Sequence, residues 1–161
     1  MKFNKSFFKV ESHEKEHWQF EHRLIQEYLA ARAMAQLEYD AIIELLRFEN
    51  SERIIPGWAN TITFLFGLII DETTREKLTS WILEKDSHLL VKVESDNLSE
   101  DIRISLFKSI FNSFREKNLW IHSNKFTDED LARFGKSQGA IDFLLDEITS
   151  EKNTTITKIS A

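Results

Sequence analysis

Hydrophobic and polar positions follow one period before residue 22 and another after it. Around residues 8–10 and again around 18–20, apolar residues alternate with polar ones, and the stretch 12–17 between them is charged and polar. Alternation places successive side chains on opposite faces, which is typical of β-strands. The pattern therefore predicts a β-hairpin with a charged tip over residues 1–21.

After residue 22 the apolar positions recur every three or four residues, which is the spacing of amphipathic helices. In the first of these helices Ile25, Leu29 and Ala33 form one such row. The stretch 58–70 is more apolar and is expected to be a buried helix, because it stops well short of the roughly 20 residues that cross a membrane. The pattern predicts seven helices: 22–37, 39–48, 58–70, 74–84, one that begins after Ser99, one from Thr127 to Gly135, and one that carries Ile141, Leu144, Leu145 and Ile148.

Capping residues mark several of these helix ends. A Ser or Thr three residues before an acidic residue can exchange hydrogen bonds with the helix start, and Ser alone can cap one. The predicted features are a Thr73–Glu76 capping pair, a Ser99 cap, a Thr127–Asp130 capping pair and a left-handed C-cap at Gly135. In the helix after Ser99, the apolar stripe contains Ile110 and Phe111, whereas Arg103, Lys108 and Arg115 are expected to face water.

The element order predicts a mainly α fold of stacked helix pairs, either an α-solenoid of the HEAT-like kind or an irregular bundle, with a short N-terminal β-hairpin. Four glycines and one proline are too few for an all-β sandwich of this length. We expect a β-hairpin at 1–21, a helical domain at 22–149, and at 150–161 a polar tail or the truncated start of a further repeat.

The composition narrows the classes of partner. A net charge of −6 argues against nucleic acid, because nucleic-acid binders concentrate Lys and Arg. The chain has no cysteine, so disulfides, thiolate metal sites and cysteine nucleophiles are excluded. This composition and the missing signal-peptide pattern favour a cytoplasmic protein that binds proteins rather than membranes. The four tryptophans are expected in the core, with a recognition groove as the alternative.

One short motif has metal-site spacing. His13, Glu14 and His17 match the His-Glu-x-x-His signature, in which two histidines bind zinc and the glutamate activates water. Their strand-like and charged surroundings favour a hairpin tip instead, so we expect no metal and keep a zinc peptidase as an alternative. There is no Gly-rich phosphate loop and no Gly-x-Ser-x-Gly elbow, and no catalytic residue is predicted.

A second motif covers residues 20–31 and matches a pattern of eight positions: Phe20, His22, Gln26, Glu27, Tyr28, Leu29, Ala30 and Ala31. This run resembles the segment that follows the ATPase core in NACHT-type STAND NTPases, the family that includes NOD-like receptors. In that family the motif leads from the last strand of a winged-helix subdomain into a helical domain. The resemblance implies that the chain is a fragment, or a truncated product, of a larger NTPase.

The resemblance also implies roles for the motif residues. His22 corresponds to the histidine that contacts the β-phosphate of ADP in the closed receptors, so it would sense nucleotide in the intact protein only. Phe20, Gln26 and the run Glu27 to Ala31 would pack the motif against the rest of the protein. From the spacing alone, Arg23 and Glu27 can form an intrahelical ion pair.

The function expected is that of a non-catalytic regulatory region of a NACHT-like signal-transduction NTPase, coupling nucleotide state to ligand sensing. This chain would bind no cofactor, whereas its presumed parent would bind ADP or ATP with Mg²⁺. Its partners would be proteins or the missing NTPase domain, and exposed Phe3, Phe7 and Phe8 could drive self-association. A free-standing helical interaction module is the main alternative.

Overall fold

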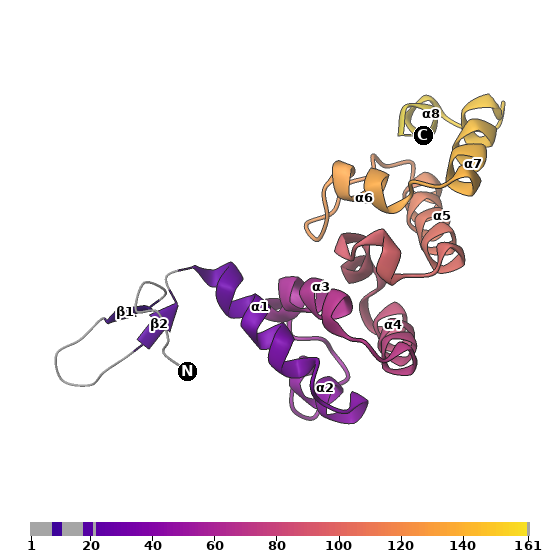
Figure 1. Cartoon of the computed structure of the whole chain (residues 1–161). Coiled ribbons are helices and arrows are strands. Elements are labelled where there is room, and N and C mark those ends of the chain that lie inside the picture. The colour runs from indigo at the N-terminus through magenta and orange to yellow at the C-terminus, as the bar shows by residue number, and fades with distance from the viewer. Residues whose placement is uncertain (1–7, 11–17, 21, 161) are drawn as a thin grey trace. The chain divides into compact units, whose positions relative to one another are not determined.

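The computed structural model describes residues 8–10, 18–20 and 22–160, and confirms that the chain is mainly helical (Figure 1). It divides into two compact units, Met1–Thr74 and Arg75–Ala161. Strands β1 (Phe8–Val10) and β2 (Trp18–Phe20) pair antiparallel, with Phe8 opposite Phe20. The hairpin tip and its flanks lie outside the described residues, so the hairpin stays a prediction.

The described part of the first unit contains three complete α-helices, at the positions that the periodicity predicts. They are α1 (Arg23–Met34), α2 (Tyr39–Leu46) and α3 (Ala59–Leu68), and a short 3-10 turn η2 (Pro56–Trp58) leads into α3. Proline begins that turn because its fixed φ suits the first helical position and its missing N–H needs no partner there. α1 and α3 pack side by side.

α1 places a narrow face in the core. Its buried residues are Glu27, Ala31 and Met34, which lie one turn apart, and the small Ala31 is completely buried. A small side chain at such a position lets a neighbouring helix approach closely. The row that reveals the helix in the sequence is a different one, since Leu29 is exposed in the structure.

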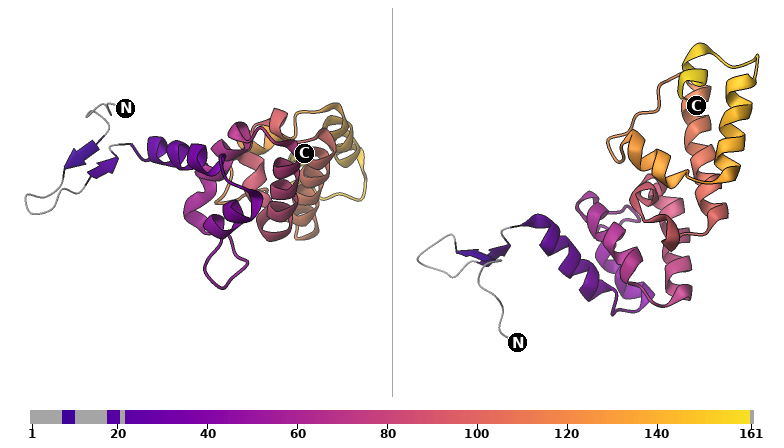
Figure 2. Two further views of the ribbon diagram at one scale, coloured as in Figure 1. Left: turned by 60° about the horizontal axis from the view of Figure 1, so that its bottom comes forward. Right: turned by 45° about the horizontal axis from the view of Figure 1, so that its top comes forward.

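The second unit contains most of α4 (Glu72–Asp86) and four further helices: α5 (Glu100–Glu116), α6 (Asp128–Phe134), α7 (Gln138–Thr149) and α8 (Thr155–Ser160), with 3-10 turns η3 (Ser87–Lys92) and η4 (Ser95–Asn97). Both α6 and α7 contact α5, and α7 lies alongside it (Figure 2). Leu106, Phe107, Ile110 and Phe111 form the buried face of α5, in agreement with the predicted stripe at Ile110 and Phe111.

Within residues 150–160 the structure has one helix, α8, that the sequence pattern does not reveal. The backbone N–H of Thr157 donates to the Thr154 hydroxyl at 3.3 Å, as at a helix N-cap. Thr157 is buried, although threonine counts as polar in a hydrophobicity pattern. A short helix of threonines, with Ile156 and Ile159 as its only large apolar residues, therefore has no visible amphipathic period.

Two of the predicted helix starts are confirmed and one is wrong. The Ser99 hydroxyl accepts from the N–H of Ile102, and Thr127 forms a complete capping box with Asp130. The predicted Thr73–Glu76 pair does not cap α4, because the helix begins at Glu72. Instead a carboxylate oxygen of Asp71 accepts a hydrogen bond from the N–H of Thr74 at 2.8 Å.

The left-handed cap predicted at Gly135 is also wrong. Gly135 has φ −80° and ψ 5°, a conformation open to any residue. Glycine is needed there for space, since a Cβ atom at this position would lie 2.4 Å from Cδ2 of Phe107. The end of α6 thus approaches the core face of α5 at a distance that only glycine permits.

Two arginines expected to face water are half-buried and bonded. Arg103 donates through Nη1 to the carbonyl oxygen of Phe134 at 3.2 Å. Arg115 donates through Nη1 to Oε1 of the buried Glu147 at 2.5 Å. Asn153 also donates to this carboxylate, at 2.7 Å. Both arginines therefore join α5 to later parts of the unit, which a helical period cannot indicate.

We predict that Gly135→Ala lowers the free energy of unfolding by about 1–3 kcal/mol, because the added methyl group forces the Phe107 ring out of its packed position. Urea denaturation followed by circular dichroism measures the change. Gly57→Ala is the matched control, since no atom lies within 4 Å of the Cβ position there. Equal free energies of unfolding for the two variants would contradict the prediction, because the Phe107 ring would then move aside without loss of stability.

Candidate functional site

The motif residues 20–31 pass from the end of β2 into α1. His22 occupies the N-cap position with extended backbone, φ −120° and ψ 117°, and its side chain makes no capping hydrogen bond. Its carbonyl oxygen accepts from the N–H groups of Ile25 and Gln26, at 3.1 and 3.4 Å. The imidazole is exposed and therefore open to a group outside the described structure.

Glu27 is the polar centre of this segment. Its carboxylate is only 7% exposed and accepts from Nε of Arg23 at 2.8 Å and from Nδ2 of Asn60 at 3.0 Å. The predicted Arg23–Glu27 ion pair is thus confirmed, although the Arg23 side chain is 76% exposed. Asn60 was not predicted as a partner. The sequence does contain an indication of this contact, which is an amide side chain within an apolar helix. Such a group needs a hydrogen-bond partner when it is buried.

The other motif residues fall on both sides of α1. Ala31 is buried and Ala30 half-buried, whereas Gln26 and Leu29 are exposed. Tyr28 is 40% exposed, and its ring makes a T-shaped contact with the ring of Phe64 on α3, with 5.8 Å between ring centroids. The side chain of Phe20 lies outside the described residues. Their predicted packing role therefore stays a prediction for the exposed positions.

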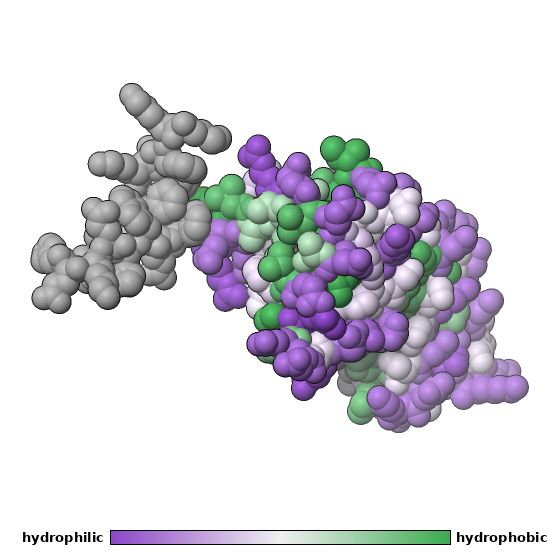
Figure 3. All heavy atoms as spheres, turned by 90° about the horizontal axis from the view of Figure 1, so that it is seen from below, coloured by the Kyte–Doolittle hydropathy of each residue, from purple (hydrophilic) through white to green (hydrophobic). Residues whose placement is uncertain are grey.

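Apolar side chains also reach the surface elsewhere in the first unit. Leu24 on α1, Leu45 on α2 and Phe48 after it are exposed. Figure 3 shows hydrophobic residues interspersed with hydrophilic ones on one face of the molecule. Single exposed apolar side chains are normal on proteins, so only a grouping at helical spacing, such as Leu24 with Tyr28, suggests a contact surface.

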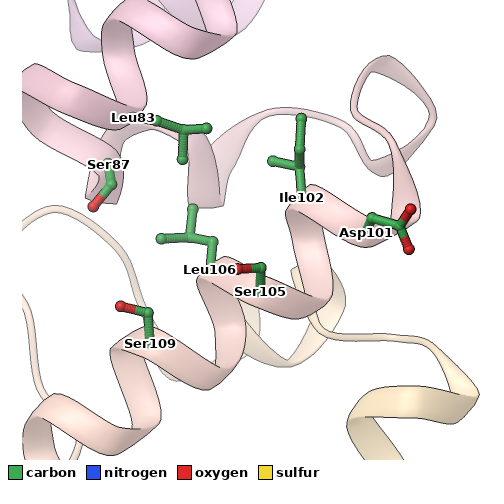
Figure 4. A pocket seen from close by; sticks show the side chains of 7 residues that line it. All are labelled: Leu83, Ser87, Asp101, Ile102, Ser105, Leu106 and Ser109. Carbon is green, nitrogen blue, oxygen red and sulfur yellow. The ribbon is translucent and has the colours of Figure 1, made fainter.

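A cavity of about 380 Å³ lies in the second unit, between the end of α4 and α5 (Figure 4). Its apolar lining includes Leu83 and Leu106, whose side chains point toward each other, and three serine hydroxyls border it, those of Ser87, Ser105 and Ser109. The sequence pattern gave no signal for it, because single serines on a helix surface are common.

The chemistry available in this cavity is limited. Asp101 is its only charged lining residue, and Figure 4 shows the Asp101 carboxylate directed away from the hydroxyls. No residue that lines the cavity is a histidine or cysteine, and a serine nucleophile needs an adjacent base. Asp101 lies in the first turn of α5, where negative charge is stabilised by the helix dipole.

Two titratable groups in the second unit have shifted pKa values. Partial burial lowers the pKa of His88, and the positive charge of Lys125 lowers it further, while Asp86 opposes both effects. Lys125 itself forms an ion pair with Asp86 at 2.5 Å, and the His88 ring meets the edge of Phe126 with 5.4 Å between centroids. Hydrogen bonds at the start of α6 lower the pKa of Glu129.

The zinc-like motif His13, Glu14 and His17 lies outside the described residues. Across the residues that the structure does describe, no group of three or more His, Asp or Glu side chains is placed to hold a metal ion. None of the described helices has the length and apolar character that a membrane span requires. The chain matches no protein-family model, no curated protein and no solved structure.

We predict that Glu27→Ala lowers the free energy of unfolding by about 1–3 kcal/mol, because it leaves the Asn60 amide without its partner. Asn60→Ala should have a comparable effect, since the carboxylate then keeps only the exposed Arg23. Arg23→Ala is the comparison variant and should cost less than Asn60→Ala, because the Arg23 side chain is 76% exposed and its ion pair is weakened by water. Urea denaturation ranks the three variants. A larger loss for Arg23→Ala than for Asn60→Ala would contradict this assignment.

We also predict that His88 makes stability depend on pH. A histidine whose pKa is lowered by folding binds protons more readily when unfolded, so stability is complete above the ordinary value of about 6.5 and falls as the pH drops below it. His88→Gln should reduce the loss of unfolding free energy between about pH 7.5 and 5. His122→Asn, which removes an exposed imidazole, is the control. An unchanged pH profile in His88→Gln would refute the role of His88.

Proposed function

We propose that this chain is a non-catalytic regulatory region of a NACHT-like signal-transduction NTPase that couples nucleotide state to ligand sensing. The observation that supports this is the exposure of His22, which stands between β2 and α1 with an imidazole that makes no capping hydrogen bond. A residue that contacts a nucleotide bound to another domain must have an exposed side chain that is not used in hydrogen bonds within its own domain. Gln26 and Leu29 are exposed on the helix that follows.

The fold agrees with such a role at the level of its helices. α1 packs along α3, and α5 along α7, as adjacent helices do in stacked helix pairs. We propose that the chain extends this arrangement as a HEAT-like or irregular stack. The chain has no phosphate loop of its own, so in this proposal it is not an enzyme and holds no cofactor, while the parent protein binds ADP or ATP with Mg²⁺. A cytoplasmic location is part of the same proposal.

A free-standing helical interaction module is the second candidate. The observation in its favour is that each unit buries an apolar core, around Leu65 and Phe66 in the first and around Ile110 and Phe111 in the second. The genomic reading frame upstream of the Met1 codon separates the candidates. A phosphate-loop sequence in that frame supports the NTPase, whereas a separate promoter and start codon support the module.

We predict that His22→Ala in the intact NTPase shifts the protein toward its open state. A hydrogen bond to a charged phosphate contributes about 1.5–3 kcal/mol, and its loss from the closed state alone raises the open population about ten- to hundredfold. Oligomerisation without ligand and the retention of bound ADP measure the shift. His122→Ala is the matched control. If His22→Ala leaves ADP retention and basal oligomerisation unchanged, His22 does not sense nucleotide.

A further inference from the structure

Helix α7 has apolar residues on two opposite faces. One face packs on α5, where the rings of Phe143 and Phe111 make a T-shaped contact with 5.3 Å between centroids. On the other face Ile141, Leu145 and Ile148 follow one another at the spacing of a single helix side, and they are 48, 54 and 42% exposed. An amphipathic helix needs only one apolar face to join its own core, so the second face is unexplained by the fold.

An apolar pocket of about 280 Å³ lies beside α7. The buried Phe107 and Leu131 contribute to its lining, and so do Trp120 and Ile159, which are both exposed. The sequence pattern favoured tryptophan in the core, and for Trp120, at 53% exposed, that expectation is wrong. A half-exposed tryptophan beside an open apolar pocket is typical of a recognition surface.

The pocket and the exposed face of α7 form one surface. Leu144 lines the pocket, and on the helix it lies one turn from both Ile141 and Ile148. Among the described residues of the second unit, every exposed large apolar side chain belongs to the segment from Leu119 to Ile159. We call this surface the α7 surface, with the members Trp120, Ile141, Leu144, Leu145, Ile148 and Ile159.

Negative charge borders the α7 surface on both sides. Asp128 is the only charged residue that lines the pocket, while Asp142 and Asp146 follow the apolar stripe on the helix flank away from Leu144. Residues 128–149 carry six carboxylates and two basic side chains, but one of the carboxylates, Glu147, is buried and paired with Arg115 of α5. One of those basic side chains, Arg133, is already paired with Asp130. Within the described part of the chain, Asp128 and Asp146 form no ion pair.

We propose that the α7 surface binds an amphipathic helix of a partner protein whose apolar face is flanked by lysine or arginine. The apolar face of that helix lies along Ile141, Leu145 and Ile148, and one large side chain enters the pocket beside Trp120. Its basic flanks meet the carboxylates on either border. Helices dock in this way in apolar grooves, with anchors every three or four residues. Opposite charges around the α7 surface steer the encounter and disfavour acidic helices.

A second copy of this chain fits the surface less well, because two copies would bring the same carboxylates face to face. The proposal is also independent of the NTPase assignment. It uses residues 107–159 only, and none of the motif residues 20–31. Failure of one therefore leaves the other untouched.

The test uses the whole chain and a fluorescein-labelled synthetic helix of 18 residues, roughly five turns, with leucine on one face and lysine on the others. Fluorescence anisotropy at physiological ionic strength measures binding. We expect Ile141→Gln with Leu145→Gln to weaken binding at least tenfold, and Asp142→Asn with Asp146→Asn to weaken it severalfold and to reduce its salt dependence. Leu45→Gln, at an equally exposed position on α2, is the matched control and should bind as the wild type does.

NMR of the wild-type chain locates the peptide without any substitution. Shifts confined to the Trp120 indole and to the methyl groups of Ile141, Leu145 and Ile148 support the proposal. Equal binding of a peptide with glutamate in place of lysine overturns it, and so do shifts spread elsewhere. A concentration-dependent dimer that the Ile141→Gln and Leu145→Gln changes dissolve also overturns it, because the occupant is then a second copy.

Discussion

In the described part of each unit, a buried glutamate accepts hydrogen bonds from an arginine and an asparagine. In the first unit Glu27 accepts from Arg23 and Asn60. In the second, Glu147 accepts from Arg115 and Asn153. A buried carboxylate without donors costs far more than a buried methyl group contributes. The rotation of each helix about its own axis is therefore set by the place where its glutamate can find donors.

This constraint explains which apolar residues remain outside. With Glu27 turned toward α3, Leu29, two residues further along, must lie on the opposite side of α1, and it is exposed. With Glu147 turned toward α5, the stripe at Ile141 and Ile148 must face outward. Burying a leucine contributes about 1.5–3 kcal/mol, which does not outweigh leaving an ionised carboxylate unpaired in the core. The exposed apolar faces are thus a consequence of polar burial.

Local chemistry in the sequence predicts much of the fold. Helical periodicity locates the first three helices, and hydroxyl residues ahead of apolar stripes mark the starts of α5 and α6, because both signals act over a few residues. The failures involve longer range. Gly135 is set by Phe107, on another helix, and Arg115 is held by Glu147, 32 positions away. At α4, Asp71 and Thr73 can each cap a helix, and the sequence does not decide between them.

In the candidate site, too, some features can be predicted from the local sequence and others depend on packing between distant segments. The motif around His22 can be found from residue order alone, since its eight positions all fall within residues 20–31, and its Arg23–Glu27 pair follows from helical spacing. Asn60 comes from a helix 33 positions away, so only packing brings it to Glu27. The α7 surface combines both kinds of information. Its stripe is visible in the sequence as Ile141, Leu145 and Ile148, but a stripe alone predicts burial.

Exposure changes the meaning of such a stripe. The buried face of α7 already meets α5 through Phe143 and Glu147, so the fold gains nothing further from three large apolar side chains on the opposite side. Exposed apolar side chains add nothing to the stability of the fold, but any complex that buries them is stabilised by the hydrophobic effect. The carboxylates along both borders then restrict which complexes form, because a partner must neutralise Asp128 and Asp146 as it covers the apolar residues. A carboxylate that loses water must gain a hydrogen-bond donor. This cost determines how Glu147 is buried inside the unit, and it also determines which partners can cover Asp128 and Asp146 at its surface.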